Sequence, residues 1–76
     1  MLILSKAKIS IRGQNVHVEG KWNRHAAKIR GFVHDLRLTE GVIRHRFGQI
    51  VFSKHIPAGA HQRLRNFLVN ECPMRD

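Results

Sequence analysis

Histidine is the residue type in this chain with the widest chemistry, because a neutral imidazole ring binds metal ions and exchanges protons near pH 7. The 76 residues include six histidines, at positions 17, 25, 34, 45, 55 and 61. No two of them stand at the spacings that place two ligands on one face of a helix or a strand. Cys72, the single cysteine, has no close histidine partner in the sequence. We therefore expect no metal site, with most histidines on the surface and His45 among the apolar residues of a strand.

Catalysis by carboxylates or nucleophiles has little support. The five carboxylates, at positions 19, 35, 40, 71 and 76, include no close pair of the kind that acid–base hydrolysis uses. The serines and Thr39 lie in no nucleophile-elbow context, and no glycine loop of a nucleotide-binding type is present. Cys72 precedes Pro73, so we interpret it as a small apolar residue at a helix end. The sequence predicts a protein that is not an enzyme and needs no cofactor.

Charge is the strongest compositional signal. Fourteen Lys and Arg stand against five Asp and Glu, a formal net charge of +9, and nine of the fourteen are Arg. A guanidinium group offers paired donors to phosphate or carboxylate, and a surface this basic attracts polyanions. Nucleic acid and an acidic protein both fit. An anionic membrane surface fits less well, because the apolar helix residues described below are needed to cover a sheet.

Two features favour a cytoplasmic protein. A single cysteine cannot form an intrachain disulfide, which fits a reducing compartment. The apolar residues 1–4 are followed at once by Ser5 and Lys6, and they lack the charged start and the longer apolar run of a signal peptide. No run approaches the roughly 18 apolar residues of a membrane span.

The elements that would position the charges follow from the hydrophobic pattern. Apolar and polar residues alternate on both sides of the Gly-Gln pair at positions 13–14, which predicts a β-hairpin with a two-residue type II′ turn. This turn pairs Ile11 with Val16 and Ile9 with Val18, so that all four side chains share one face.

A second hairpin is predicted around the Gly-Gln pair at positions 48–49. A two-residue turn there pairs Phe47 with Ile50 and His45 with Phe52. The apolar face is again continuous, and we expect Phe47 and Ile50 to be buried.

Two segments have helical spacing. The first runs from about Asn23, a suitable N-cap, to about residue 38, and Gly41 follows as a helix stop. The second covers about residues 58–71 and ends before Pro73. The apolar stripes consist of Ala26, Ile29, Phe32, Val33 and Leu36 in the first segment and of Leu64, Phe67 and Leu68 in the second.

The two halves of the chain resemble each other. At a shift of 35 residues, the turn at 13–14 falls on 48–49 and residues 28–33 fall on 63–68. The apolar strand residues align better at a shift of 34, which predicts a slipped residue or a bulge.

These patterns predict a single domain, residues 1–76, with an internal repeat of about 8–41 and 42–73. The predicted fold class is α+β: a duplicated ββα-ββα unit that forms a four-stranded antiparallel sheet with two helices on one face. Neither hairpin could bury its apolar face alone, which is why the two units are expected to share one sheet.

The second half also carries a short motif that resembles a family of small bacterial proteins of unknown function. The motif consists of Ser53, Ile56 and Pro57 at a strand end, followed by Gln62-Arg63-Leu64-Arg65-Asn66. The resemblance implies a bacterial source and no particular activity.

The basic residues are the candidates for binding. In the predicted register one set lies on the sheet face away from the helices, and a second set lies at equivalent positions of the two helices and would extend the first. The first set is Lys8, Arg12, Arg44 and Arg46, with Ser10, His17, Val51 and His55 on the same face; the second is Lys28, Arg30, Arg63 and Arg65. The phenylalanines fall on predicted core positions, so contacts would be made to phosphates without base readout.

Three interpretations of this charge stay open. The first is a non-catalytic basic domain that binds DNA or RNA through phosphate contacts. The second is a protein-interaction or structural module, which acts as a homodimer through a sheet edge or the uncovered face, or as a small subunit bound to an acidic partner. In the third, Lys and Arg only keep a small domain soluble.

Overall fold

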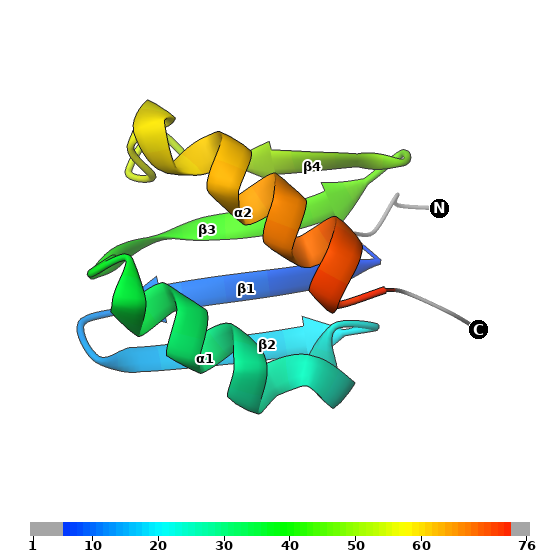
Figure 1. Cartoon of the computed structure of the whole chain (residues 1–76), viewed down its shortest axis with the longest axis horizontal. Helices are drawn as coiled ribbons and strands as arrows, with labels where there is room; N and C mark the ends of the chain where they lie inside the picture. Colours follow the sequence, from blue (N-terminus) through cyan, green and yellow to red (C-terminus); the bar gives the residue numbers. More distant parts are fainter. Residues whose placement is uncertain (1–5, 74–76) are drawn as a thin grey trace, which may run out of the picture.

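The structure, a computed structural model, describes residues 6–73 of the chain (Figure 1). The apolar residues 1–4 that entered the expectation of a cytoplasmic protein lie outside the described residues. The elements in chain order are β1 (Ala7–Arg12), β2 (Asn15–Gly20), the 3-10 helix η1 (Asn23–His25), α1 (Ala26–Asp35), β3 (Glu40–Arg46), β4 (Gln49–Phe52) and α2 (Ala58–Glu71). The order ββα-ββα is as predicted, whereas an origin by duplication of one unit stays a prediction.

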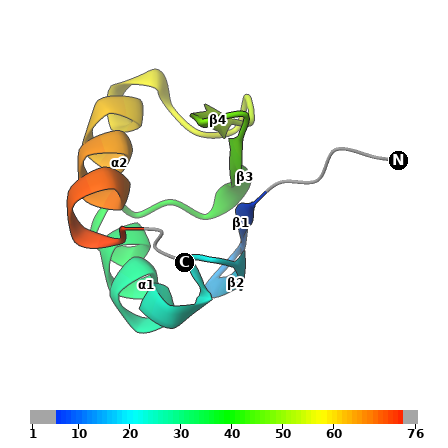
Figure 2. The same ribbon diagram turned by 90° about the vertical axis from the view of Figure 1, so that its right-hand side faces the viewer.

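The four strands form one antiparallel sheet in the order β2-β1-β3-β4. Both helices lie on the same side of this sheet, and the other face carries no element of the described chain (Figure 2). In Figure 1, α1 lies in front of β2 and α2 crosses in front of β3. The predicted α+β class is therefore confirmed. No helix within residues 6–73 combines the length and the apolar character that crossing a membrane requires.

The first hairpin has the predicted register. Ile11 pairs with Val16 and Ile9 with Val18, and all four side chains are buried. Gly13 has a φ of 61°, whereas Gln14 does not have a positive φ. This combination is the one that a type II′ turn requires, with the glycine at its first central position.

The predicted turn of the second hairpin is wrong by one residue. The central turn residues are Phe47 and Gly48, with φ of 49° and 75°, and two positive φ values make this a type I′ turn. His45 therefore pairs with Ile50, and Phe52 pairs with Ile43, which is fully buried. This register keeps a large apolar pair beside the core, but it places Phe47 at the hairpin tip, where its side chain is 70% exposed.

The predicted ends of the first helix also need correction. Asn23 is not the N-cap of α1, because its side-chain amide donates a hydrogen bond to the carbonyl of Val18 at 2.9 Å. The helix ends at Asp35, and Arg37, two residues beyond, has a φ of 59° that allows the backbone N–H groups of residues 37 and 38 to bond back to the last turn. Gly41, the predicted stop, is the second residue of β3, and Ile56 packs where its Cβ would be.

Helix α2 has the bounds that the periodicity predicted, and Leu64 and Leu68 are its buried residues. Phe67 is partly buried and stacks on Phe32 of α1, with ring centroids 4.1 Å apart and an interplanar angle of 2°. These two phenylalanines stand 35 positions apart, the shift at which the helices were aligned. This stack joins the two helices above the middle of the sheet.

The strand pairs of the two hairpins are related by a shift of 34 residues. Moving the pair Ile9–Val18 by 34 positions gives Ile43–Phe52, and every other β1–β2 pair from residue 9 to 12 moves onto a β3–β4 pair in the same way. Ile9 and Ile43 also pair with each other across the centre of the sheet, and both are fully buried. The turn at residues 47–48 thus accounts for the one-residue slip without a bulge.

Candidate functional site

The uncovered face of the sheet carries the first predicted set of basic residues. Because side chains alternate along a strand, the burial of Ile9, Ile11 and Ile43 toward the helices directs Lys8, Arg12, Arg44 and Arg46 to the other face. We call these four side chains the sheet-face cations. Arg12 is exposed and the other three are half-buried, so their aliphatic stems lie along the sheet.

Two of the sheet-face cations lie directly opposite each other. Lys8 on β1 pairs with Arg44 on β3 in the antiparallel register. Like charges at directly opposite positions repel each other. Within residues 6–73, neither side chain has a hydrogen-bond or ion-pair partner. The centre of this face therefore carries two adjacent cations that form no ion pair within the described residues.

The two acidic residues of this face within the described chain each contact a histidine. Glu19 on β2 lies 3.4 Å from Nε2 of His17, and Glu40 at the start of β3 lies 3.4 Å from Nε2 of His55. His55 follows β4 in the chain. Its contact with Glu40 places it at the edge of the uncovered face, the face predicted for it. Two sheet-face cations lie opposite a carboxylate in the register, Arg12 opposite Glu40 on β3 and Lys8 opposite Glu19 on β2. Neither forms an ion pair with that carboxylate among the described residues.

The second predicted set does not join the first. Helices α1 and α2 cover the opposite side of the sheet, so the side chains they carry are separated from the sheet-face cations (Figure 2). Lys28 donates to the carbonyl of Glu71 at 3.1 Å, and Arg65 lies over the ring of Phe52 at 5.2 Å. Arg63 is exposed and makes no such contact with the described residues.

Arg30, the remaining helix residue of that set, covers a sheet edge. Its Nε donates to the carbonyl of Val16 at 3.2 Å, next to the bond from Asn23 to Val18. Both carbonyls lie on the outer side of β2, so side chains from η1 and α1 occupy that edge. No side chain of residues 6–73 bonds in the same way to the outer edge of β4.

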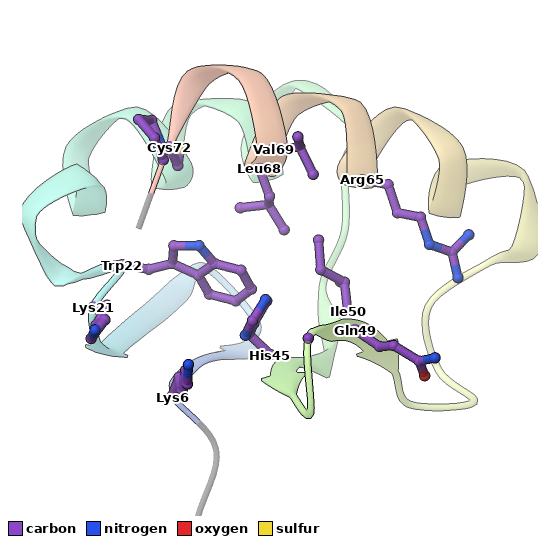
Figure 3. Close-up of a pocket in the computed structure, with 12 residues that line it drawn as sticks. Lys6, Lys21, Trp22, His45, Gln49, Ile50, Arg65, Leu68, Val69 and Cys72 are labelled. Atoms are coloured by element: carbon purple, nitrogen blue, oxygen red, sulfur yellow. The ribbon is translucent and has the colours of Figure 1, made fainter. Parts of the chain in front are cut away.

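A cavity of about 870 Å³ lies between α2 and the β3–β4 hairpin (Figure 3). Trp22, His45, Ile50 and Leu68 line its middle, and Val69, which is 64% exposed, lies at its mouth. Trp22 lies between β2 and η1, at a strand–helix junction, and its side chain is only 1% exposed. The cavity itself was missed, because its size depends on how far α2 stands from the hairpin.

Backbone contacts place Lys6 and Lys21 next to His45 in the lining of this cavity. The N–H of Lys6 donates to the carbonyl of His45 at 2.9 Å, and the N–H of Lys21 donates to the carbonyl of Lys6 at 3.1 Å. Figure 3 shows Lys6 and Lys21 on one side of His45 and Arg65 on the other. The cavity thus has cationic residues at both ends and apolar residues between them.

His45 is the polar group at the centre. Its ring meets that of Trp22 edge to face, at 6.1 Å between centroids and 80° between planes. Its Nδ1 is buried and has no hydrogen-bond partner among the described residues. Burial, and secondarily the charge of Lys6, lowers the pKa of His45 below its usual value of 6.5, so the ring is neutral at pH 7. Its position in an otherwise apolar strand pattern is the one signal in the sequence that marks this cavity.

Cys72 forms part of the cavity wall as the residue that ends α2. It is 1% exposed, and burial raises the pKa of its thiol, so the group stays protonated and apolar at neutral pH. This agrees with its interpretation as a small apolar residue at a helix end.

Within residues 6–73, no three His, Cys, Asp or Glu side chains come together in an arrangement that could hold a metal ion. A comparison with protein-family models finds no match, and comparisons with curated proteins and with solved structures find none either. The resemblance of the second half to small bacterial proteins therefore stays a prediction, and function is inferred from the geometry of the described residues.

Proposed function

We propose that the chain is a non-catalytic basic domain that binds nucleic acid through phosphate contacts at the uncovered face of its sheet. The observation that carries this proposal is the pair of Lys8 and Arg44, which lie directly opposite each other and form no ion pair with any acidic side chain of the described residues. A phosphate between the two side chains turns a repulsive pair into two charge-assisted contacts. Arg12 and Arg46 on the same two strands extend the contact along the sheet.

The contact is to backbone phosphates rather than to bases. A base-stacking sheet displays aromatic rings on its open face, whereas Phe32, Phe52 and Phe67 are partly buried on the helix side here. Val51, 43% exposed, and the half-buried Val42 are the apolar strand residues that this face presents within the described chain. Phosphate contacts carry no sequence information of their own, so we expect binding with little sequence preference.

The proposal predicts a definite dependence on salt. Four phosphate contacts give a slope of about −3.6 when log K is plotted against log salt concentration for duplex DNA, and a smaller slope of about −2.8 for single strands. The measurement is fluorescence anisotropy of labelled duplex DNA, single-stranded DNA and RNA, titrated with the full chain at several salt concentrations.

A matched pair of double variants separates this surface from general charge attraction. Lys8→Gln/Arg44→Gln removes two sheet-face cations, which should reduce the magnitude of the duplex slope by about 1.8. Arg24→Gln/Arg63→Gln removes two exposed cations from η1 and α2 and should leave the slope unchanged. An equal loss in both variants, or no binding at physiological salt, would contradict the proposal.

A protein-interaction module is the second candidate, and one observation favours it. The outer edge of β2 is bonded by Arg30 and Asn23, whereas the outer edge of β4 has no such cover within residues 6–73. An uncovered strand edge accepts another strand through main-chain hydrogen bonds. Phe47, exposed at the end of the same hairpin, would add an apolar contact to a partner there.

A further inference from the structure

The cavity between α2 and the β3–β4 hairpin lies on the helix side of the sheet and is not part of the proposed phosphate-binding face. Lys8 and Arg44 do not line it. What this cavity binds is therefore a separate question, which does not depend on whether the sheet-face cations bind nucleic acid.

The middle of the cavity is suited to an apolar group. Its apolar lining residues include Ile50, which is partly buried, and Val69, which is 64% exposed, with the buried Trp22 and Leu68 beside them. Its volume of about 870 Å³ falls within the roughly 300–1,000 Å³ of pockets that hold small organic ligands. Such pockets combine mainly apolar walls with a few polar groups that orient the ligand.

The polar lining of the cavity is suited to an anion. Lys6, Lys21 and Arg65 line it, and no Asp or Glu is among its lining residues. The fourth ionisable residue that can carry positive charge, His45, is neutral at pH 7 because of its burial, and its Nδ1 lacks a partner among the described residues. Buried polar atoms in native proteins nearly always have a partner. Cationic ends around an apolar middle therefore match a ligand that is itself amphipathic.

We propose that this cavity is a binding site for a small organic anion with an apolar body, of the class of aliphatic or aromatic carboxylates. The apolar body packs on Ile50 and Val69, next to the buried Trp22. The carboxylate pairs with the cations at the ends of the cavity, Lys6 and Arg65 among them (Figure 3).

The chain supplies its own reporter for a binding experiment. Trp22 is its single tryptophan, and it lines the cavity. The experiment titrates the full chain with decanoate below its micelle concentration and follows tryptophan emission, with titration calorimetry as a second measurement. Decan-1-ol and decyltrimethylammonium have a similar apolar chain with a neutral and a cationic head. We expect saturable binding of decanoate, with at least about tenfold weaker binding of the other two, because a tenfold change in affinity needs only about 1.4 kcal/mol.

Two matched sets of variants locate the site. Lys6→Gln/Arg65→Gln removes two lining cations and should weaken decanoate binding about tenfold, whereas Arg24→Gln/Arg63→Gln removes the same charge outside the cavity and should leave it within about twofold. All four residues are exposed, so the folded state should survive, which circular dichroism checks.

Substitutions of two adjacent residues on β4 test the contribution of the apolar lining. Ile50→Ala shortens a side chain in the cavity and should weaken decanoate binding, whereas Val51→Ala alters the opposite face of β4 and should not. Equal binding of the three probes, an equal loss in both double variants, or no saturable binding by either method would overturn the proposal.

Discussion

His45 shows how one residue takes on properties that its type alone does not determine. A histidine on a strand is usually exposed and titrates near neutral pH. Here its neighbours in the register are Ala7 and Ile50, its ring meets Trp22, and its Nδ1 is buried. The pKa of the ring is therefore lowered, by burial first and by the charge of Lys6 second.

This lowered pKa predicts a loss of stability in acid. Below the usual pKa of 6.5, the unfolded chain binds a proton at His45 more readily than the folded chain does, so the free energy of unfolding falls as the pH falls from 6.5 toward the folded pKa. Urea unfolding between pH 5 and pH 7 should show a smaller pH dependence in His45→Gln than in the wild type. His17→Gln, which alters an exposed ring, is the control and should keep the wild-type dependence. A His45→Gln profile parallel to the wild type would refute this assignment.

Phe47 is the residue whose backbone is least suited to its side chain. A bulky residue with a φ of 49° is unusual, because the left-handed region crowds its Cβ against the carbonyl. The side chain is 70% exposed, with the guanidinium of Arg46 at 5.7 Å from the ring centroid. Glycine or asparagine would serve this turn position better, so the turn itself does not explain why a phenylalanine is there.

At the scale of elements, the pairing of β1 with β3 determines which charged residues stabilise the sheet and which destabilise it. Lys8 faces Arg44 across these strands, whereas Arg12 faces Glu40. Opposite charges at directly opposed positions stabilise a sheet by about 0.2–1 kcal/mol, and like charges destabilise it. The pair of Lys8 and Arg44 therefore lowers the stability of the sheet, although Lys8 also lies opposite Glu19 on β2.

Two charge-reversal substitutions test how opposed charges on β1 and β3 affect stability. Arg44→Glu creates an opposite-charge pair with Lys8 and should raise the free energy of unfolding by about 0.5 kcal/mol, while weakening polyanion binding. Arg12→Glu creates a like-charge pair with Glu40 and should lower the free energy of unfolding by a similar amount. Both substitutions change the net charge equally, so chemical denaturation of the two variants compares the pairing alone. Stability changes of the same sign in both variants would refute the argument.

At the scale of the whole molecule, the two layers divide the basic residues between two environments. The uncovered face of the sheet carries Lys8, Arg12, Arg44 and Arg46, and the helix side carries the cavity with Lys6 and Arg65 at its ends. The sheet's own thickness separates them, so each surface can be altered while the other stays intact.

The two edges of the molecule differ as well, which predicts how it associates. Strand pairing through β4 would depend on main-chain hydrogen bonds and on Phe47, so a homodimer of this kind should be insensitive to salt, unlike phosphate binding. Sedimentation equilibrium of the chain at low and at high salt measures this directly. A dimer at both salt concentrations that weakens in Phe47→Ser supports the second candidate function, and a monomer throughout argues against a homodimer.

The sequence by itself determined the elements whose signals are local. The bounds of α2 and the register around Gly13 and Gln14 follow from patterns that a short segment carries alone: a 3.6-residue period before Pro73, and strict alternation about a glycine turn. The face of Lys8 and Arg44 followed too, because alternation assigns each strand residue to one side once the core residues are known.

Only the tertiary structure decided the features that depend on distant contacts. The second turn lies at Phe47-Gly48 rather than at Gly48-Gln49, because Phe52 pairs with the fully buried Ile43. The chain after α1 turns at Arg37 rather than at Gly41, which lies in β3 where Ile56 packs. The separation of the helix-borne cations from the sheet face, and the cavity beside α2, arise from how whole elements pack. Local periodicity contains no information on the distance between elements, because packing joins residues far apart in the sequence.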